Sequence, residues 1–409
     1  MKAVVFHDVG DVRLDQVPDP TLQERSDAIV RITASAICGT DLHMVRGTLT
    51  GMEPGTIIGH EAIGIVEEVG KDVRNLQRGD RVVVPSTIAC GACSYCRAGY
   101  YAQCDVANPN GPRAGTCFFG GPKQTGSVHG LQAEYARIPY AHTGPVKLPE
   151  ALPDDEAILL SDIFPTSWFA AELAEVGPGD TVAVFGCGIV GQLAIASAII
   201  RGAGRVIAVD TVASRLERAR GQGAEPIDYE REDPVQTILE LTNGIGVDRA
   251  LDAVGVDANR PSRGPAAERS TELEAEFARQ LGQVAPRTAD DGPNWRPGDA
   301  PSQVLEWAVD ALAKAGTLGI VGVYPPALRS FPIGAAMNKN LTVKAGNCDH
   351  RRYLHALIDL VQSGAISIAK NLTQDEPMDD VLAAYREFDR REPGWVKVKL
   401  RPEAVPAAA

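Results

Sequence analysis

From Thr181 onward, short apolar runs alternate with segments that show helical periodicity. Such alternation is typical of a parallel sheet whose strands are joined by crossover helices. We therefore predict a doubly wound α/β domain over residues 164–324. Its expected strands are Thr181–Phe185, Arg205–Val209, Val247–Val254 and Thr317–Val321.

Before this block the chain follows a different pattern. The first 160 residues are rich in glycine and proline and hold short apolar runs such as Ala28–Thr33 and Ile63–Val69. Short strands between turn residues favour an antiparallel, barrel-like β domain. We expect the tail to rejoin this domain, which would then comprise residues 1–163 and 325–409. The elements expected in the tail are helices over Arg352–Ser363 and Met378–Arg390 and a strand over Trp395–Leu400.

One segment, Asp257–Pro301, interrupts the α/β pattern. It holds six prolines and many charges, and a loop of this length inside a compact domain needs an explanation. Thr271 and Glu274 have the spacing of a capping box. They stand ahead of apolar residues at helical spacing, so the insertion is predicted to contain one amphipathic helix with an apolar face of Leu273, Phe277 and Leu281.

Composition narrows the possible partners. At 409 residues, two domains are the default expectation. A net charge of -13 without a basic run argues against a nucleic-acid partner, because phosphate binding needs clustered lysine and arginine. The run Leu193–Ile200 is too short to cross a bilayer, and Asp8 and Asp11 stand where a signal peptide would be apolar. We expect a cytoplasmic protein with a small-molecule partner and no membrane partner.

A glycine fingerprint follows the first strand of the α/β domain. Gly186, Gly188 and Gly191 have the G-x-G-x-x-G spacing, and the helix opens at Ile189 and Val190. The first glycine permits a tight turn, the second lets the backbone approach a pyrophosphate, and the third allows helix and strand to pack closely. Free N–H groups at the helix N-terminus then bind the phosphates. The fingerprint predicts a Rossmann-type dinucleotide site.

The end of the next strand indicates which dinucleotide binds. Asp210 ends that strand nineteen residues after Gly191, where a carboxylate accepts hydrogen bonds from the adenosine ribose. A carboxylate there repels a 2'-phosphate, which favours NAD over NADP. Arg215 either softens this preference or is a solvated helix residue.

Four of the eight cysteines fall within fifteen residues. A disulfide framework is the less natural interpretation in a long, apparently unsecreted chain. Four thiolates instead complete a closed tetrahedral zinc site with no position for a substrate. We predict a structural zinc in a lobe over about residues 88–106, held by Cys90, Cys93, Cys96 and Cys104.

Three further metal-binding residue types are dispersed along the chain. Cys38, His60 and Asp162 each also fit an ordinary role, as a small core residue, a turn histidine and a helix cap. Sequence spacing alone does not join them.

Taken in order, the motifs resemble those of the zinc-containing medium-chain alcohol dehydrogenases over nearly the whole chain. The resemblance rests on Cys-Gly-Thr-Asp-Leu-His (38–43), Gly-His-Glu (59–61), the cysteine lobe, Ala-Glu-Tyr (133–135) and the glycine fingerprint. Leu159–Asp162 and the insertion are similar to the formaldehyde dehydrogenase-like branch, which includes glutathione-independent enzymes. The resemblance implies a GroES-like β-rich catalytic domain beside the Rossmann domain.

The resemblance also assigns site residues. Cys38, His60 and Asp162 become the ligands of a catalytic zinc, which makes two zinc ions per chain. Glu61 becomes a transient ligand or a group that tunes the charge of the metal. Thr40 accepts the substrate proton, which passes through the cofactor ribose to His43.

Three further assignments keep a structural alternative. Thr166 contacts the nicotinamide end or is an ordinary first-turn threonine. The tail lysines Lys397 and Lys399 reach the pyrophosphate or form a solvated face. The aromatic residues Trp168, Phe118 and Phe119 line a substrate pocket or are packing residues.

The function implied by the resemblance is hydride transfer between a primary alcohol or hydrated aldehyde and NAD. A polyol or secondary-alcohol dehydrogenase is the alternative within enzymes, and a non-catalytic NAD-binding protein is the alternative outside them. A homo-oligomer is expected, with a tetramer favoured over a dimer. The insertion either covers the cofactor or forms an oligomer contact. The remaining cysteines are expected to bind no metal: Cys117, Cys187 and Cys348.

Overall fold

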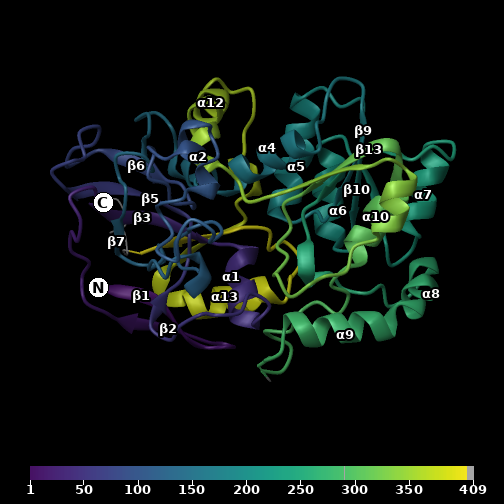
Figure 1. Cartoon of the computed structure of the whole chain (residues 1–409), viewed down its shortest axis with the longest axis horizontal. Coiled ribbons are helices and arrows are strands. Elements are labelled where there is room, and N and C mark those ends of the chain that lie inside the picture. Colours follow the sequence, from purple (N-terminus) through teal and green to yellow (C-terminus); the bar gives the residue numbers. More distant parts are fainter. Residues whose placement is uncertain (290, 403–409) are drawn as a thin grey trace. The chain divides into compact units, whose positions relative to one another are not determined.

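The computed structural model describes residues 1–289 and 291–402 (Figure 1). The chain divides into two compact units. The first unit comprises Met1–Pro165, Ala289–Trp295 and Asn347–Ala409, and the second comprises Thr166–Thr288 and Arg296–Gly346. Residues 325–346 therefore lie with the second unit, whereas the sequence pattern placed its end at residue 324. The reason is an additional strand, Thr342–Ala345, which extends the sheet of that unit.

The second unit is built on a parallel sheet. Among the described residues it has six strands in the order β11-β10-β9-β12-β13-β14. The four predicted strands are present, Thr181–Phe185 with its predicted ends and the other three with shifted ends. Strands β11 and β14 were missed because neither is a continuous apolar run. The strands are β9 (Thr181–Phe185), β10 (Arg205–Asp210), β11 (Glu225–Asp228), β12 (Val247–Asp252), β13 (Leu312–Ile320) and β14 (Thr342–Ala345).

Both faces of this sheet are covered by helices, as in a doubly wound fold. Val182 and Val184 of β9 belong to a core cluster with residues of α5 and α6. Ala183 and Phe185 belong to a separate cluster with residues of α7 and α10. Alternate side chains thus enter opposite layers, which explains why the strand is apolar throughout. These helices are α5 (Ile189–Ile200), α6 (Ala213–Gly221), α7 (Pro234–Leu241) and α10 (Gln303–Ala311); α11 (Ile333–Asn338) precedes β14.

The first unit is β-rich. Within the described residues its larger sheet has seven strands in the order β15-β16-β3-β5-β6-β8, with β7 also paired to β3, and its smaller sheet has the order β2-β1-β4. β16 pairs with β3, so the tail returns to this unit. The strands are β1 (Lys2–Asp8), β2 (Asp11–Gln16), β3 (Ala28–Ile37), β4 (Thr56–Ile57), β5 (Ala62–Val69), β6 (Arg81–Val84), β7 (Tyr135–Ile138), β8 (Val146–Lys147), β15 (Gln374–Pro377) and β16 (Val398–Arg401).

The helices of the first unit are short. The two predicted tail helices are present: α12 begins two residues earlier than expected, and α13 begins after a 3₁₀ turn at Met378–Asp380. The helices are α1 (Gly39–Arg46), α2 (Ser94–Arg97), α3 (Asp154–Ala157), α12 (His350–Gln362) and α13 (Val381–Asp389); α4 (Ile163–Leu173) continues from this unit into the second. Every helix in the described part of the chain is too short or too polar to span a bilayer.

The described residues of the insertion form two helices, so the prediction of one helix with a capping box at Thr271 is wrong. Helices α8 (Pro265–Glu272) and α9 (Glu274–Val284) meet at Leu273. The Thr271 hydroxyl donates to the carbonyl of Ala267, which places Thr271 inside the first helix rather than at an N-cap. A hydroxyl that bonds a carbonyl four residues earlier satisfies itself within the helix and cannot cap the next one.

The end of the insertion belongs to the first unit. The side chain of Asn294 and the backbone N–H of Trp295 donate to Asp389 Oδ2 at 3.0 and 2.8 Å. Asp389 also pairs with Arg46 of α1 at 2.8 Å, and both side chains are buried. The indole of Trp295 is itself only 2% exposed. Residues 291–295 are therefore an integral part of the first unit.

Candidate metal centres and dinucleotide loop

The structure brings the dispersed metal-binding residues together in the first unit. Cys38, His60, Glu61 and Asp162 are buried, and one ligand atom of each lies within 4.8 Å of the others. The sheet explains the approach of the first three. Cys38 follows β3, His60 and Glu61 precede β5, and these strands pair antiparallel with Ser35 opposite Ala62.

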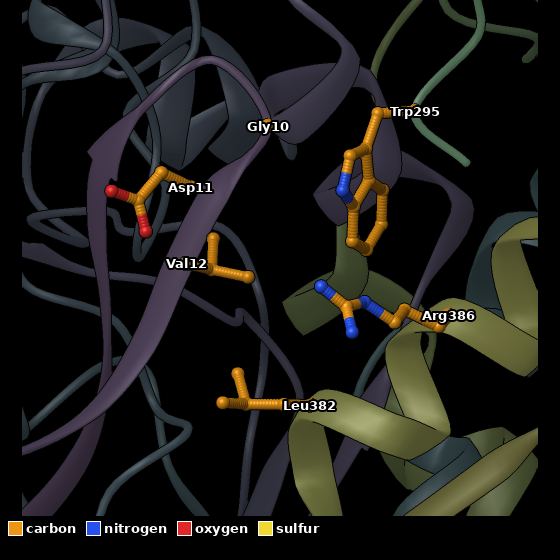
Figure 2. Close-up of a pocket in the computed structure, with 6 residues that line it drawn as sticks. All are labelled: Gly10, Asp11, Val12, Trp295, Leu382 and Arg386. Atoms are coloured by element: carbon orange, nitrogen blue, oxygen red, sulfur yellow. The ribbon is translucent and has the colours of Figure 1, made fainter. Parts of the chain in front are cut away.

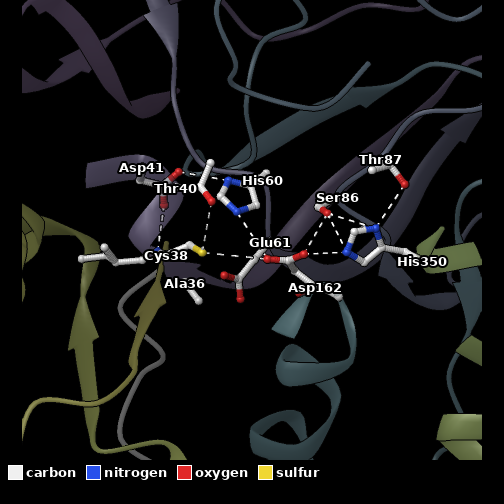
Figure 3. A network of polar contacts seen from close by, with 12 residues as sticks. Ala36, Cys38, Thr40, Asp41, His60, Glu61, Ser86, Thr87, Asp162 and His350 are labelled. Atoms are coloured by element: carbon white, nitrogen blue, oxygen red, sulfur yellow. Dashed lines mark hydrogen bonds and ion pairs between the residues drawn. The ribbon is translucent and has the colours of Figure 1, made fainter. Parts of the chain in front are cut away.

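The potential ligand atoms face one another (Figure 3). Asp162 Oδ2 lies 3.9 Å from the Cys38 sulfur and 3.5 Å from His60 Nε2. The turn before His60 needs a glycine, because Gly59 has a φ of +88° and a Cβ there would meet the Gln132 side chain at 2.4 Å. A thiolate, an imidazole and a carboxylate at these spacings fit zinc.

A carboxylate behind His60 orients the imidazole. Asp41 Oδ1 lies 3.0 Å from His60 Nδ1, which leaves Nε2 directed at Asp162. The other Asp41 oxygen accepts from the backbone N–H of Cys38 at 2.9 Å and from Gln132 at 3.2 Å. A carboxylate on the outer nitrogen is the usual support of a metal-binding histidine. Sequence reasoning missed this role, although Cys38 and Asp41 have the spacing of a capping box.

Glu61 is held by a buried lysine. Lys397 Nζ lies 2.5 Å from Glu61 Oε1 and 3.0 Å from the carbonyl of Ile37, and both charged side chains are fully buried. The predicted alternative of a solvated lysine face is therefore wrong. Lys399 is also buried and pairs with Asp155 and Asp375. The second Glu61 oxygen is buried without a hydrogen-bond partner among the described residues, as expected of a group beside a metal.

The Asp162 oxygen that is directed away from Cys38 and His60 contacts two further side chains. This oxygen, Oδ1, lies 2.5 Å from His350 Nε2 and accepts from the Ser86 hydroxyl at 3.1 Å. His350 Nδ1 lies 3.2 Å from the Thr87 hydroxyl (Figure 3). Sequence reasoning missed Ser86 and His350, and no motif marked either residue.

The charges in this cluster favour a cation. Burial by itself would lower the pKa of His60, but Asp41 and Asp162 outweigh burial and raise it well above 6.5. Burial would raise the pKa of Asp162, but His350 and His60 outweigh burial and lower it well below 3.8. Burial raises the pKa of the Cys38 thiol. A metal ion would take the place of these bound protons, so the donor set fits the predicted zinc.

The two predicted proton-transfer residues lie on α1. The Thr40 hydroxyl is 3.9 Å from the Cys38 sulfur. His43 is buried and its Nδ1 lies 2.9 Å from the Thr48 hydroxyl. The structure thus places Thr40 at the cluster and His43 one helical turn further along.

The four-cysteine lobe forms a second compact donor set. The sulfur atoms of Cys90, Cys93, Cys96 and Cys104 lie within 4.8 Å of one another. Backbone N–H groups donate to three of these sulfurs at 3.3 to 3.5 Å. Burial alone would raise the pKa of Cys93, but backbone N–H groups of Cys96 and Asp105 outweigh it and lower the pKa to about 7. Such bonds stabilise thiolates, so this set also fits zinc.

The glycine fingerprint has the geometry of a dinucleotide loop. Gly186 has a φ of +87° at the end of β9, and Gly188 is the N-cap of α5. A Cβ on Gly191 would lie 1.8 Å from the carbonyl oxygen of Gly186, so only glycine fits where helix and strand cross. Ile189 and Val190 form the first turn, whose N–H groups are oriented to bind phosphate.

The residues predicted near the adenosine lie close to this loop. Asp210 ends β10 and accepts from the backbone N–H of Cys187 at 2.7 Å. Arg215 Nη1 lies 4.0 Å from the position of a Cβ on Gly188. Arg215 is half-buried in α6, and its Nε is buried without a hydrogen-bond partner in the described residues, so its role beside the cofactor stays a prediction. Thr166 lies in the first turn of α4.

The three aromatic residues singled out in the sequence lie in different surroundings. The Phe118 ring stands edge-on to His60, with centroids 6.2 Å apart, so it lies beside the metal-binding cluster. Phe119 is 2% exposed within the β-domain core. Trp168 packs under the guanidinium of Arg201 in the second unit.

A pocket of about 120 Å³ in the first unit lies at the end of the insertion (Figure 2). Trp295 lines it from the insertion, and Leu382 and Arg386 line it from α13. The rest of the lining comes from Gly10, Asp11 and Val12. Its lining contains none of the predicted site residues and no cysteine, serine or histidine, so the polar cluster of Figure 3 is the stronger candidate site.

Comparisons with known proteins agree with this arrangement. Residues 24–150 match the alcohol dehydrogenase GroES-like domain, and residues 190–262 match the zinc-binding dehydrogenase family. The chain is 35% identical over 406 residues to the uncharacterized zinc-type alcohol dehydrogenase-like protein AdhB of Bacillus subtilis, covering 98% of this chain and 100% of AdhB. It is 34% identical over 406 residues to the glutathione-independent formaldehyde dehydrogenase of Pseudomonas aeruginosa, covering 96% of each.

Solved structures show the same likeness. Alcohol dehydrogenase TADH from Thermus sp. ATN1 superposes with a TM-score of 0.78 at 32% identity, covering 98% of this chain and 99% of that one. The predicted fold class is confirmed: a GroES-like β-rich domain and a Rossmann-type parallel sheet.

Proposed function

This chain belongs to the zinc-type medium-chain alcohol dehydrogenase family, and from that premise we propose that it transfers a hydride between a primary alcohol or hydrated aldehyde and NAD. The observation that carries the proposal is the buried assembly of Cys38, His60 and Asp162, with Asp41 behind the histidine. An NAD-binding protein without catalysis would have no need to preserve both the three ligand types and the supporting carboxylate.

Zinc held by Cys38, His60 and Asp162 would supply a Lewis acid that makes a substrate hydroxyl easier to ionise, and NAD would accept the hydride. The chain's own residues do the rest. Asp41 lies 3.0 Å from the outer nitrogen of His60 and favours a proton on that nitrogen, and Lys397 holds Glu61 next to the ligands as a charge-tuning group. The Thr40 hydroxyl accepts the substrate proton, and His43 on the same helix is the residue that releases it.

We propose NAD rather than NADP as the cofactor. The Asp210 carboxylate beside the glycine loop would repel a 2'-phosphate. Arg215 approaches the same loop and would attract that phosphate, so it weakens the preference without reversing it. Gly186, Gly188 and Gly191 would hold the pyrophosphate, and Thr166 would contact the nicotinamide end.

The formaldehyde dehydrogenase-like branch is the proposed subgroup. The relative from Pseudomonas aeruginosa and the long insertion support it. We also propose a homo-oligomer, with a tetramer favoured. The edge strand β14 and the exposed apolar side chains of Ile333 and Met337, 69% and 79% exposed, supply a surface suited to a second copy.

Zinc content and NAD reduction, measured on wild type and on Asp162→Ala, test the proposal. The expected result is two zinc ions per chain and turnover with short primary alcohols or aldehydes. Asp162→Ala should retain one zinc and lose turnover. Turnover confined to polyols or secondary alcohols would move the chain to that other class of dehydrogenase. One zinc in the wild type and NAD binding without turnover would contradict the proposal.

A further inference from the structure

The short segment Asn347–His350 contacts Ala102 of the cysteine lobe and Asp162 of the buried cluster, both in the first unit. The Asp349 carboxylate accepts a 2.7 Å hydrogen bond from the backbone N–H of Ala102. The next side chain, His350, lies 2.5 Å from Asp162. Asp349 and His350 are 5% and 3% exposed, so both contacts are shielded from water. Two neighbouring residues therefore connect the cysteine lobe to a catalytic ligand.

The hydrogen-bond pattern defines what His350 does. Asp162 offers only acceptor oxygens, so the proton of the neutral imidazole must be on Nε2, which donates to Oδ1. Nδ1 then accepts from the Thr87 hydroxyl at 3.2 Å. With Oδ1 occupied by His350 and Ser86, the other oxygen, Oδ2, is the one directed at Cys38 and His60.

The residues that contact His350 and Asp349 also lie close in sequence to the cysteines of the lobe. Ser86 and Thr87, which contact the imidazole, lie on the same stretch of chain as Cys90. Ala102, which holds Asp349, lies two residues before Cys104. The first and last cysteines of the lobe are thus each close in sequence to a contact of the Asp349–His350 pair.

The lobe packs into the unit largely through its cysteines, because Cys90, Cys96 and Cys104 belong to the buried core cluster of the β-rich unit. Its only regular elements are the four-residue helix α2 and a 3₁₀ turn at Tyr101–Gln103. Four thiolates without a cation would repel one another, whereas a bound cation would hold them together. The position of the Ala102 N–H therefore depends on the state of the four cysteines.

We propose that Asp349 and His350 couple the two metal sites. An ordered lobe fixes Asp349, Asp349 fixes the start of α12, and His350 holds Asp162 in the orientation that binds the catalytic metal. His350 is thus a positioning residue rather than a catalytic one. This inference rests on the proposed function, because it requires metal at both sites.

Zinc affinity at the Cys38 site, measured in the intact protein by competition with a chromophoric chelator, tests the coupling. Asp162→Ala identifies which zinc belongs to this site. The test variants are Asp349→Ala, a lobe variant carrying Cys93→Ser and Cys96→Ser, and their combination. Asp349→Asn keeps an acceptor for the Ala102 N–H. Asp80→Ala is a control away from both metal sites, because it removes an exposed carboxylate bond to the backbone N–H of Gln77 and the ion pair with Lys147.

The expected result is that Asp349→Ala and the lobe variant each weaken zinc binding at the Cys38 site about tenfold. Their combination should weaken it no further, because both act through the same contact. Asp349→Asn and Asp80→Ala should match wild type. His350→Leu should weaken zinc binding, and His350→Gln, which can still donate to Asp162, should restore most of it.

Two outcomes would overturn the coupling: unchanged zinc affinity in Asp349→Ala, or effects that multiply in the combined variant. If Asp349→Ala does not fold, Ala102→Pro removes the same bond from the other side and is judged by the same criteria. Coupled zinc binding in a chain that oxidises no alcohol would overturn the proposed function alone. An active wild type with uncoupled sites would overturn this inference alone.

Discussion

Asp41 Oδ1 lies 3.0 Å from His60 Nδ1, and this contact directs the other imidazole nitrogen at Asp162. Asp41→Asn removes the charge while keeping the size of the side chain. We expect it to weaken zinc binding at the Cys38 site by roughly 10- to 100-fold, as is usual for such supporting groups. Chelator competition measures the loss. Asp15→Asn is the matched control, because Asp15 contacts His7 at the surface at 2.7 Å. Equal affinity in Asp41→Asn and wild type would contradict the role of Asp41.

Lys397 and Glu61 form a fully buried ion pair. Lys397→Met leaves the Glu61 carboxylate without its partner, which should lower the free energy of unfolding by about 3–5 kcal/mol. Adding Glu61→Gln should restore much of that loss, because neither charge then remains. Denaturant unfolding measures both effects. Lys2→Met, which removes the surface partner of Asp379, should have little effect. If Lys397→Met were as stable as wild type, the buried Glu61 carboxylate would not need the lysine as a partner, and the prediction would be wrong.

Gly191 lies where α5 crosses β9. A methyl group there would overlap the Gly186 carbonyl, so Gly191→Ala should destabilise the second unit by about 1–3 kcal/mol and weaken NAD binding. Gly221, at the end of α6, has open space around its Cβ position and is exposed. Gly221→Ala should therefore be neutral or slightly stabilising. Thermal unfolding with and without NAD compares the two variants, and equal behaviour would contradict the close-packing argument.

Asp210 faces the glycine loop with a negative charge. Asp210→Asn removes the repulsion of a 2'-phosphate while keeping an acceptor for the Cys187 N–H. We expect the ratio of kcat/KM for NADP to that for NAD to rise by at least about tenfold, since like-charge contacts cost several kcal/mol. Arg215→Ala should shift the ratio in the opposite direction. An unchanged ratio in both variants would place the adenosine elsewhere.

Asp389 anchors the end of the insertion. Asp389→Ala removes the buried carboxylate that pairs with Arg46 and accepts from Asn294 and Trp295, so the first unit should lose about 3–5 kcal/mol of stability. Limited proteolysis should also cleave the insertion faster. Val106→Ala, at an exposed position of the first unit outside the pocket that Trp295 lines, is the control. Cleavage at the wild-type rate in Asp389→Ala would show that other contacts hold this segment.

Local patterns were enough to predict much of the fold. The strand Thr181–Phe185 was predicted with its observed ends because it is apolar throughout and is followed by a glycine turn. The short strand β11 was missed because Glu225–Asp228 contains a proline and two charges, and only its pairing with β10 makes it a strand. The single helix predicted in the insertion failed for a related reason, because the Thr271 hydroxyl bonds within its own helix.

The sequence by itself determined the four-cysteine lobe and the glycine loop, because their residues are neighbours and spacing alone limits their geometry. Only the tertiary structure decided the buried cluster. Cys38 and His60 meet through the pairing of β3 with β5, and Asp162 arrives from a segment about a hundred residues away. Lys397 and His350 join from the tail because β16 pairs with β3 and α12 packs in the same unit. Contacts between distant segments depend on how sheets pair and pack, and no local pattern of residues specifies that.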